Sequence, residues 1–296
     1  MVLKKRTKKN LFLAGMLIVP AAHFVVFWGI ANFNLILLAF QGLNPTTQKV
    51  YWTFNNFRMI WALFGKYGAL REALGNTLLT WGFLCFFLLP WSFVLTYFIY
   101  KKIRLSPMWR TVLFLPTLLP AVAMASIFTY IIYPDAPFGK FMALFAKNIP
   151  AFLNDPRYAK WTIVFYIFWT NFGGSFILIS GAMARVPKEI IESAYLDGAG
   201  MGTELRRILF PLCWPTLSTL LLLNTAGLFM ASGPVLILTY GENGTATISF
   251  WIFNQVNKLK NYYTTSALGL ACTLVLFPIV LLVRWGLSKI YANVEF

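Results

Sequence analysis

Long apolar runs alternate with short polar segments along the whole chain. The hydrocarbon core of a bilayer is about 30 Å thick, so a helix needs roughly 20 apolar residues to cross it. The runs that reach this length cover residues 11–40, 74–100, 109–133, 161–184, 212–240 and 265–285. This pattern predicts an all-α polytopic membrane protein with six transmembrane helices. Prolines interrupt several runs, and we expect kinks at Pro20, Pro90, Pro116, Pro120, Pro215, Pro234 and Pro278.

The composition agrees with a surface that faces lipid. The 296 residues are 59% hydrophobic and only 11% charged, whereas a soluble domain carries about 25% charged residues. The first run, 11–40, follows a basic segment as a signal peptide does, but it is about twice as long as a signal peptide's apolar region. We therefore expect an uncleaved first helix, with 1–10 as a basic N-terminus and 11–296 as one transmembrane domain.

The distribution of basic residues predicts the orientation. Lys and Arg number 25 against 9 Asp and Glu, and an excess of basic residues marks cytoplasmic loops. Segments 1–10, 101–110, 185–211 and 284–296 hold 15 basic residues, whereas 41–73, 134–160 and 241–264 hold 10 in a longer stretch. We expect the first set and both termini to be cytoplasmic, with the basic residues facing lipid headgroups rather than nucleic acid.

Residues suited to catalysis are scarce in this sequence. His23 is the single histidine, the three cysteines lie far apart, and no phosphate-binding G-x-x-x-x-G-K-[ST] string occurs. We expect no metal site, no bound cofactor and no enzymatic activity. No carboxylate lies at the middle of a predicted span, which counts against a secondary carrier, since such carriers need ionisable groups at that depth.

The predicted cytoplasmic loop 185–211 is unusual because four of the nine acids gather there, namely Glu189, Glu192, Asp197 and Glu204. Pro187 suits the first turn of a helix and Gly198 suits its left-handed end, which predicts a short helix between them. Its polar face is mainly acidic and includes Leu196. A helix lying on the membrane would carry basic residues there, so docking to a partner protein is favoured over membrane binding.

The loop resembles the EAA loop of ABC importer permeases. That motif reads E-A-A, three residues, G, nine residues and I-x-L-P. Here Glu192-Ser193-Ala194 is followed by Gly198 and then by Ile208-Leu209-Phe210-Pro211, with the same spacing throughout. Two positions depart from the motif, because Ser193 replaces alanine and Phe210 replaces leucine. Segments 55–57, 73–77, 110–116, 133–135 and 262–269 resemble the carbohydrate-type branch, related to the maltose-type permeases.

The resemblance implies a type I importer permease fold and a set of partners. These are two ABC ATPase subunits that bind ATP and Mg, a second and homologous permease, and an extracytoplasmic solute-binding protein, all at a prokaryotic inner membrane. In the loop, Glu192 is expected to contact the ATPase, Ala194 to permit close approach and Leu196 to insert into the partner. Asp197 and Gly198 are expected to fix the turn, and for Asp197 a local helix-cap role and direct contact with the ATPase are equal alternatives.

The substrate pathway is less readable from sequence. Polar residues within the fourth and fifth runs are Asn171, Asn224, Thr225 and Ser232. They are candidates for contact with a sugar, but polar residues inside membranes often join helices instead. The resemblance implies import of a sugar or oligosaccharide. The alternatives are an importer permease for an amino acid, a polyamine or an ion, or a secondary carrier.

Overall fold

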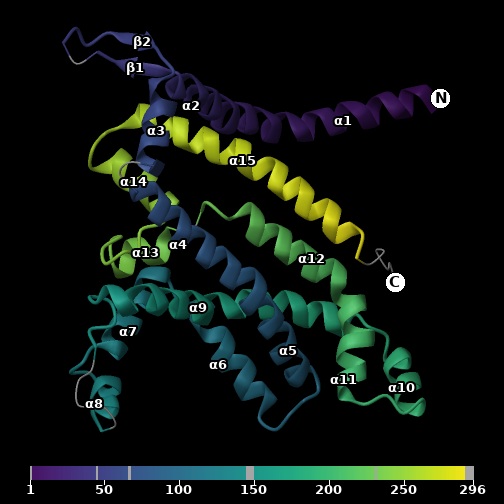
Figure 1. Cartoon of the computed structure of the whole chain (residues 1–296). Coiled ribbons are helices and arrows are strands. Elements are labelled where there is room, and N and C mark those ends of the chain that lie inside the picture. Colours follow the sequence, from purple (N-terminus) through teal and green to yellow (C-terminus); the bar gives the residue numbers. More distant parts are fainter. Residues whose placement is uncertain (1, 45, 66–67, 145–149, 231, 291–296) are drawn as a thin grey trace. The chain divides into compact units, whose positions relative to one another are not determined.

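A computed structural model describes residues 2–44, 46–65, 68–144, 150–230 and 232–290. These residues are mostly helical (Figure 1). The chain divides into two compact units, one made of 1–67 with 254–273 and the other of 68–253 with 274–296. The single transmembrane domain expected over 11–296 therefore stays a prediction.

The first unit begins with a long, mostly exposed apolar helix made of α1 (Val2–His23), the π-helical η1 (Phe24–Ile30) and α2 (Ala31–Ala39). An antiparallel hairpin follows, with β1 (Gln41–Leu43) paired to β2 (Val50–Trp52). Apart from this short hairpin the described elements are helical, so the predicted all-α fold class is confirmed. Helix α3 (Asn55–Gly65) is joined to α2 and to β1, because Asn56 Nδ2 donates to the carbonyls of Ala39 and Gln41, at 2.9 and 2.8 Å.

In the second unit the apolar runs form long helices. Helix α4 (Ala69–Phe83), the π-helical η2 (Leu84–Leu88) and α5 (Leu89–Tyr100) are continuous. Further along, α9 (Pro156–Ala184) precedes a second continuous helix of α11 (Met201–Thr203), the π-helical η3 (Glu204–Leu209) and α12 (Phe210–Ala226). Helix α15 (Tyr262–Ser288) belongs partly to each unit. Within the described ranges, five helices are long and apolar enough to cross a membrane.

Two predicted spans are broken in the structure. The third, expected over 109–133, consists of α6 (Ser106–Leu118) and α7 (Ala121–Ile132), bent by 112°; counted as one span, this pair would be the sixth. Leu119 has an extended backbone there, as a residue before proline prefers. The fifth, expected over 212–240, begins earlier, at Met201, and its helix ends at Ala226. The short α13 (Gly233–Leu238) follows as a separate helix, with Pro234 in its first turn, where proline is favoured.

Prolines also explain two of the π-helical stretches. Pro90 is the second residue of α5 and Pro211 the second of α12, and each directly follows a π-helical segment. A proline inside a helix has no N–H to donate and its ring collides with a carbonyl one turn earlier. Widening the preceding turn relieves both problems, so each helix continues through its proline instead of ending there.

The second unit is built around α9. This helix begins where Asp155 accepts a hydrogen bond from the Arg157 backbone N–H at 2.9 Å. It packs against α5, α6 and α12, and its buried residues share an apolar core with those of α5 and α12. The contact with α6 is close at Gly173, where an added Cβ would lie 2.7 Å from the Thr117 methyl. The core therefore fixes the helices on either side of loop 185–211.

Side chains at the start of the 69–100 helix fasten a distant loop. Asn76 Nδ2 donates to the carbonyls of Gly244 and Ala246, each at 2.8 Å, and Thr77 Oγ1 accepts from the Ile248 N–H at 3.0 Å. Ile248 begins α14 (Ile248–Asn257). Both side chains are buried, so these bonds satisfy backbone groups that would otherwise be buried without partners. The helix is thus fixed at this end by directional bonds.

Candidate functional site

The acidic loop folds as a short helix with well-defined ends. Helix α10 (Lys188–Leu196) starts after Pro187, and Glu189 lies in its first turn, near the positive end of the helix dipole. At its other end the Gly198 N–H donates to the Tyr195 carbonyl at 3.0 Å, and the Ala199 N–H donates to the Ala194 carbonyl at 2.9 Å. This pair of bonds is the Schellman arrangement, and it fixes where the helix stops.

Gly198 supplies the backbone conformation that this ending requires. Its φ is 79°, in the left-handed region that side-chain-bearing residues avoid. A Cβ built at this position meets no atom within 4 Å. Glycine is therefore required here by the backbone angle and not by crowding. The left-handed end that the sequence predicts is confirmed.

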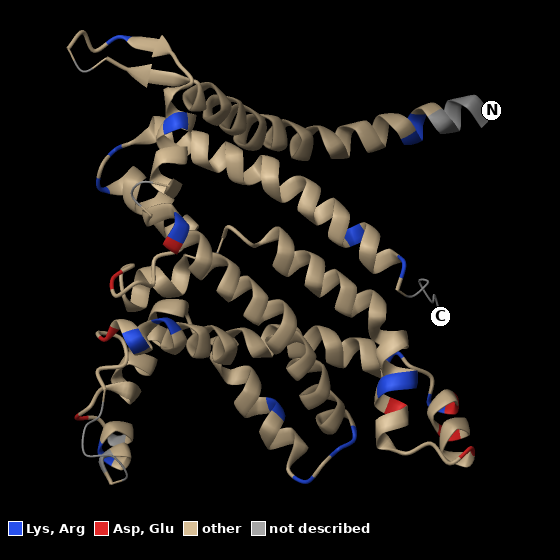
Figure 2. Cartoon of the chain, viewed as in Figure 1, with Lys and Arg blue, Asp and Glu red and all other residues tan. Residues whose placement is uncertain are grey.

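The two faces of α10 have different surroundings. Ile191 is buried in the core beside residues of α9 and α12, which anchors the inner face. On the outer face Leu196 is 90% exposed, Glu192 and Ser193 are exposed, and Ala194 is half-buried. Acidic residues gather over α10 and the start of the following helix (Figure 2). The exposed leucine and carboxylates leave this face accessible, as the docking hypothesis requires.

Two acids of the motif, Glu192 and Asp197, are exposed, one within α10 and one directly after it. Among the residues that the structure describes, the carboxylates of Glu192 and Asp197 make no hydrogen bond or ion pair. Asp197 follows the last residue of α10, and its backbone N–H donates to the Ser193 carbonyl at 3.0 Å. Its backbone therefore takes part in the turn while its exposed side chain does not.

The rest of the motif lies on the helix that leads into the membrane. Ile208 is half-buried against the core, and Pro211 occupies the second position of α12. Met201 begins this helix, so the segment after Gly200 continues directly into the 201–226 helix. The motif therefore joins an exposed helix to the end of a long apolar one through three residues, 197, 198 and 199, and the cap at Gly200.

A buried carboxylate joins α10 to two of the long helices. Glu204 is 1% exposed, and its Oε1 lies 2.7 Å from Lys101 Nζ. Its Oε2 accepts hydrogen bonds from the hydroxyls of Tyr97, at 3.0 Å, and Tyr195, at 2.7 Å. Lys101 Nζ also donates a hydrogen bond to the Tyr195 hydroxyl, so this lysine contacts both Glu204 and Tyr195. We call these four residues the Glu204 cluster.

The Glu204 cluster contains one positive and one negative group, Lys101 and Glu204, which form an ion pair. Burial by itself lowers the pKa of Lys101, but hydrogen bonds and charge interactions with Glu204 and Tyr195 outweigh it and raise the pKa above its usual value. The lysine therefore stays protonated at physiological pH and keeps the carboxylate paired. Sequence reasoning missed this cluster, because its members lie in three segments. The sequence singles out Glu204 only as one of the four acids of loop 185–211 and gives no sign of its partners.

The four candidate substrate residues are not brought together. Thr225 is fully buried, where its hydroxyl donates to the Leu221 carbonyl at 2.8 Å and accepts from Trp81 Nε1 at 3.4 Å. Asn171 is exposed, but its amide donates to the Ile167 carbonyl at 2.9 Å. Asn224 is half-buried, and Ser232 precedes α13 and is also half-buried. Among described residues no hydrogen bond joins any two of the four, so their role in a pathway stays a prediction.

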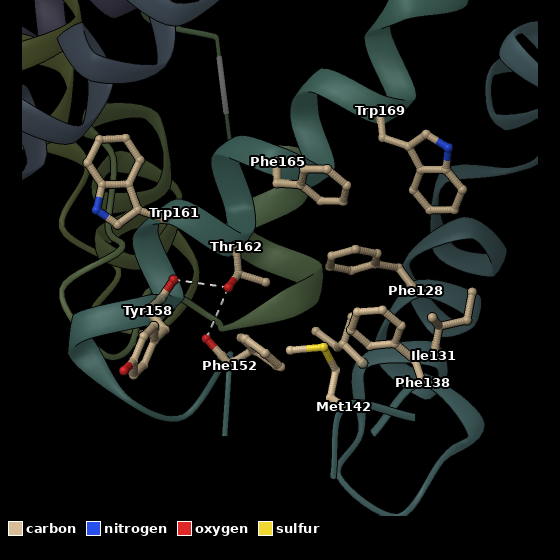
Figure 3. A pocket seen from close by; sticks show the side chains of 11 residues that line it. Phe128, Ile131, Phe138, Met142, Phe152, Tyr158, Trp161, Thr162, Phe165 and Trp169 are labelled. Carbon is tan, nitrogen blue, oxygen red and sulfur yellow. Dashed lines mark hydrogen bonds between the residues drawn. The ribbon is translucent and has the colours of Figure 1, made fainter. Parts of the chain in front are cut away.

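A large hollow lies between α7, α9 and α8 (Pro137–Ala143). It encloses about 620 Å³, and aromatic rings, including those of Phe128, Trp161 and Phe165, line most of it (Figure 3). The Thr162 hydroxyl in its wall already bonds the carbonyls of Tyr158 and Phe152, at 3.0 and 3.3 Å. A sugar needs several converging polar groups, which this hydrocarbon lining does not offer.

Comparisons with known proteins agree with this geometry. The chain is 30% identical over 207 residues to a probable ABC transporter permease protein of Mycoplasma pneumoniae, with 65% of this chain and 62% of that protein covered. It is 26% identical over 175 residues to the trehalose/maltose transport system permease protein MalF of Thermococcus litoralis, with 58% of each covered. The matched region thus spans less than two thirds of the length of either relative.

The fold has a counterpart among solved structures. A chain in the crystal structure of a bacterial alginate ABC transporter, in complex with an alginate pentasaccharide-bound periplasmic protein, superposes with a TM-score of 0.85. The two chains are 21% identical, and the alignment covers 98% of this chain and 99% of that one. This likeness confirms the expected importer permease fold. Residues 88–290, more than half of the sequence, match a family model, and the chain therefore belongs to the binding-protein-dependent transport system inner membrane component family.

Proposed function

We propose that this chain is the membrane-spanning permease subunit of an ATP-driven importer for a sugar or oligosaccharide. The observation that carries the proposal is the outer face of α10. There Leu196, which is 90% exposed, and the exposed Glu192 lie on a helix that ends at Gly198. This helix continues, through one turn of backbone, into the 201–226 helix.

The proposed partner of α10 is an ABC ATPase subunit. In this proposal two such subunits bind ATP and Mg and carry out the hydrolysis, while the permease binds no cofactor and supplies no catalytic group. Leu196 inserts into a cleft of the ATPase, Glu192 provides a polar contact, and the small Ala194 permits close approach. When ATP closes the ATPase dimer, α10 moves with it and shifts the membrane helices as rigid bodies between two arrangements.

The substrate class and the remaining partners follow from the relatives. The Thermococcus litoralis protein is named for trehalose and maltose, and the solved transporter is described with alginate and a periplasmic protein. We infer a carbohydrate substrate for this chain, an extracytoplasmic binding protein that delivers it, and a second, homologous permease that forms the other half of the pathway. Import of an amino acid, a polyamine or an ion is disfavoured by the carbohydrate names of these relatives.

Purification of the complex tests the proposal. The tagged chain, isolated from membranes of its own host in mild detergent, should bring down an ABC ATPase and a second permease, and mass spectrometry should identify both with any bound carbohydrate. The complex should hydrolyse ATP, whereas the chain separated from its partners should not. ATP turnover by the isolated chain, or a complex without an ATPase, would contradict the assignment.

The proposed orientation places α10 in the cytoplasm and the β-hairpin outside. Lys49, in the hairpin loop, and Lys188, at the start of α10, are both exposed. In intact cells a membrane-impermeant thiol reagent should label the Lys49→Cys variant and leave the Lys188→Cys variant unlabelled. Opening the cells should make both reactive. Labelling of Lys188→Cys alone in intact cells would reverse the topology.

A further inference from the structure

We infer that the Glu204 cluster makes α10 move together with the 69–100 and 201–226 helices. This inference rests on the proposed function, because it assumes that α10 receives force from an ATPase. Tyr195 belongs to α10, Tyr97 and Lys101 lie at the end of the 69–100 helix, and Glu204 lies in the first turns of the 201–226 helix. Three elements therefore meet at one carboxylate.

The contacts of α10 explain why these bonds are needed. Its buried residue, Ile191, holds it against the core by apolar contact, which is not directional and permits sliding or rotation. The Tyr195 hydroxyl, in contrast, donates to Glu204 Oε2 and accepts from Lys101 Nζ. Hydrogen bonds have restricted distances and angles. They fix the rotation of α10 relative to both long helices, so a displacement of α10 is passed on to them.

The burial and charge of Glu204 strengthen the bonds that it accepts, although Tyr195 itself is 46% exposed. Glu204 is 1% exposed and the Lys101 side chain 22% exposed, and hydrogen bonds to charged groups are shorter and about twice as strong as neutral ones. A second hydroxyl, that of Tyr97, binds the same oxygen and lies 3.5 Å from the Met201 carbonyl. The Glu204 carboxylate, which belongs to the 201–226 helix, is therefore bonded to two residues at the end of the 69–100 helix. Glu204 and Tyr195 act as positioning residues, because the Tyr195 hydroxyl is bonded to Glu204 although the residue is exposed.

Two substitutions remove the connection without enlarging any side chain. Tyr195→Phe deletes the hydroxyl that joins α10 to the ion pair and keeps the ring. Glu204→Gln keeps the shape and removes the charge. Tyr100→Phe is the matched control for the first, because Tyr100 packs against the same core and its hydroxyl makes no hydrogen bond with the described part of the chain. Glu189→Gln is the control for the second, because Glu189 is exposed on α10.

Hydrogen–deuterium exchange of the purified complex in nanodiscs, ATPase included, measures the connection. Amides of α10 should exchange about tenfold faster or more in Tyr195→Phe and Glu204→Gln, as expected for the loss of a hydrogen bond to a charged group. In the wild type, trapping with ATP and orthovanadate should change exchange both in α10 and in residues 89–104. In the two variants the change should persist in α10 and disappear in 89–104. The controls should behave as the wild type.

The remaining variants and outcomes make the test decisive. Lys101→Met should leave an unpaired buried carboxylate and lower the amount of complex in the membrane, whereas Lys101→Met with Glu204→Gln should recover much of it, because no uncompensated charge remains. If Tyr195→Phe and Glu204→Gln retain their ATPase and keep the wild-type response in 89–104, the inference is wrong. If the wild type retains no ATPase, the proposed function fails, and this inference fails with it.

Discussion

Replacement of Gly198 by valine should weaken binding of the proposed ATPase partner without reducing the amount of permease in the membrane. A β-branched residue forced to a φ of 79° costs on the order of 1–3 kcal/mol in backbone strain. The short α10 relieves that strain by giving up its Schellman bonds, which turns the exposed face away from its partner. The measurement is the amount of ATPase retained on the tagged chain, normalised to permease in the membrane, with a fall of at least tenfold expected.

Gly202→Val is the matched control for this change. Gly202 is exposed in α11, an added Cβ there also meets no atom within 4 Å, and its φ is not in the positive range. Valine is acceptable at that position because a helix tolerates it better than glycine. The two variants thus add the same side chain and differ in backbone angle. Equal retention of the ATPase by Gly198→Val and the wild type would show that the end of α10 does not matter for docking.

Leu196→Asp should have an effect of similar size by a different route. Leu196 is 90% exposed, so the change is nearly neutral for the folded permease on its own. In the proposed complex the same side chain is buried in the ATPase, and centrally buried anchors are worth about 2 kcal/mol or more, roughly a thirtyfold change in affinity. Aspartate loses the apolar contact and adds an unpaired charge. ATPase retention and nucleotide hydrolysis by the complex should both fall at least thirtyfold at limiting ATPase.

Leu105→Asp is the control that tests whether a new surface charge outside α10 also reduces ATPase retention. Leu105 is 57% exposed in the turn after Tyr100, and its φ of 66° is one that aspartate adopts more readily than leucine. Retention should stay within twofold of the wild type. Lys188→Ala, at the start of α10, should also be mild. If Leu196→Asp retains as much ATPase as Leu105→Asp, Leu196 is not part of the docking surface.

The parts of the site that sequence reasoning predicted are the local ones. Pro187 and Gly198 mark the ends of α10 because the constraints they impose act within one turn of backbone. The exposed position of Leu196 follows from the same periodicity. The long apolar runs likewise determined that helices would form there, since length and composition decide this without knowledge of the neighbours.

The parts that escaped prediction depend on contacts between distant segments. The Tyr97–Glu204 bond joins residues 107 apart in sequence, and no spacing rule connects them. The break between α6 and α7 arises at Leu119 and Pro120, but prolines elsewhere, such as Pro90 and Pro211, are accommodated by π-helical turns. Whether a proline bends, breaks or merely widens a helix is decided by packing around it. Composition along the chain does not contain that information.

The helix of residues 69–100 is fixed at both of its ends, and this gives it a mechanical role. Asn76 and Thr77 hold the 244–248 segment near one end, and Tyr97 and Lys101 hold the Glu204 cluster at the other. With 32 residues at about 1.5 Å each, it is about 48 Å long, more than the thickness of the hydrocarbon core. A helix resists stretching along its axis because every turn is hydrogen-bonded. A displacement of the Glu204 cluster can therefore be transmitted along this helix to the 244–248 segment near its other end.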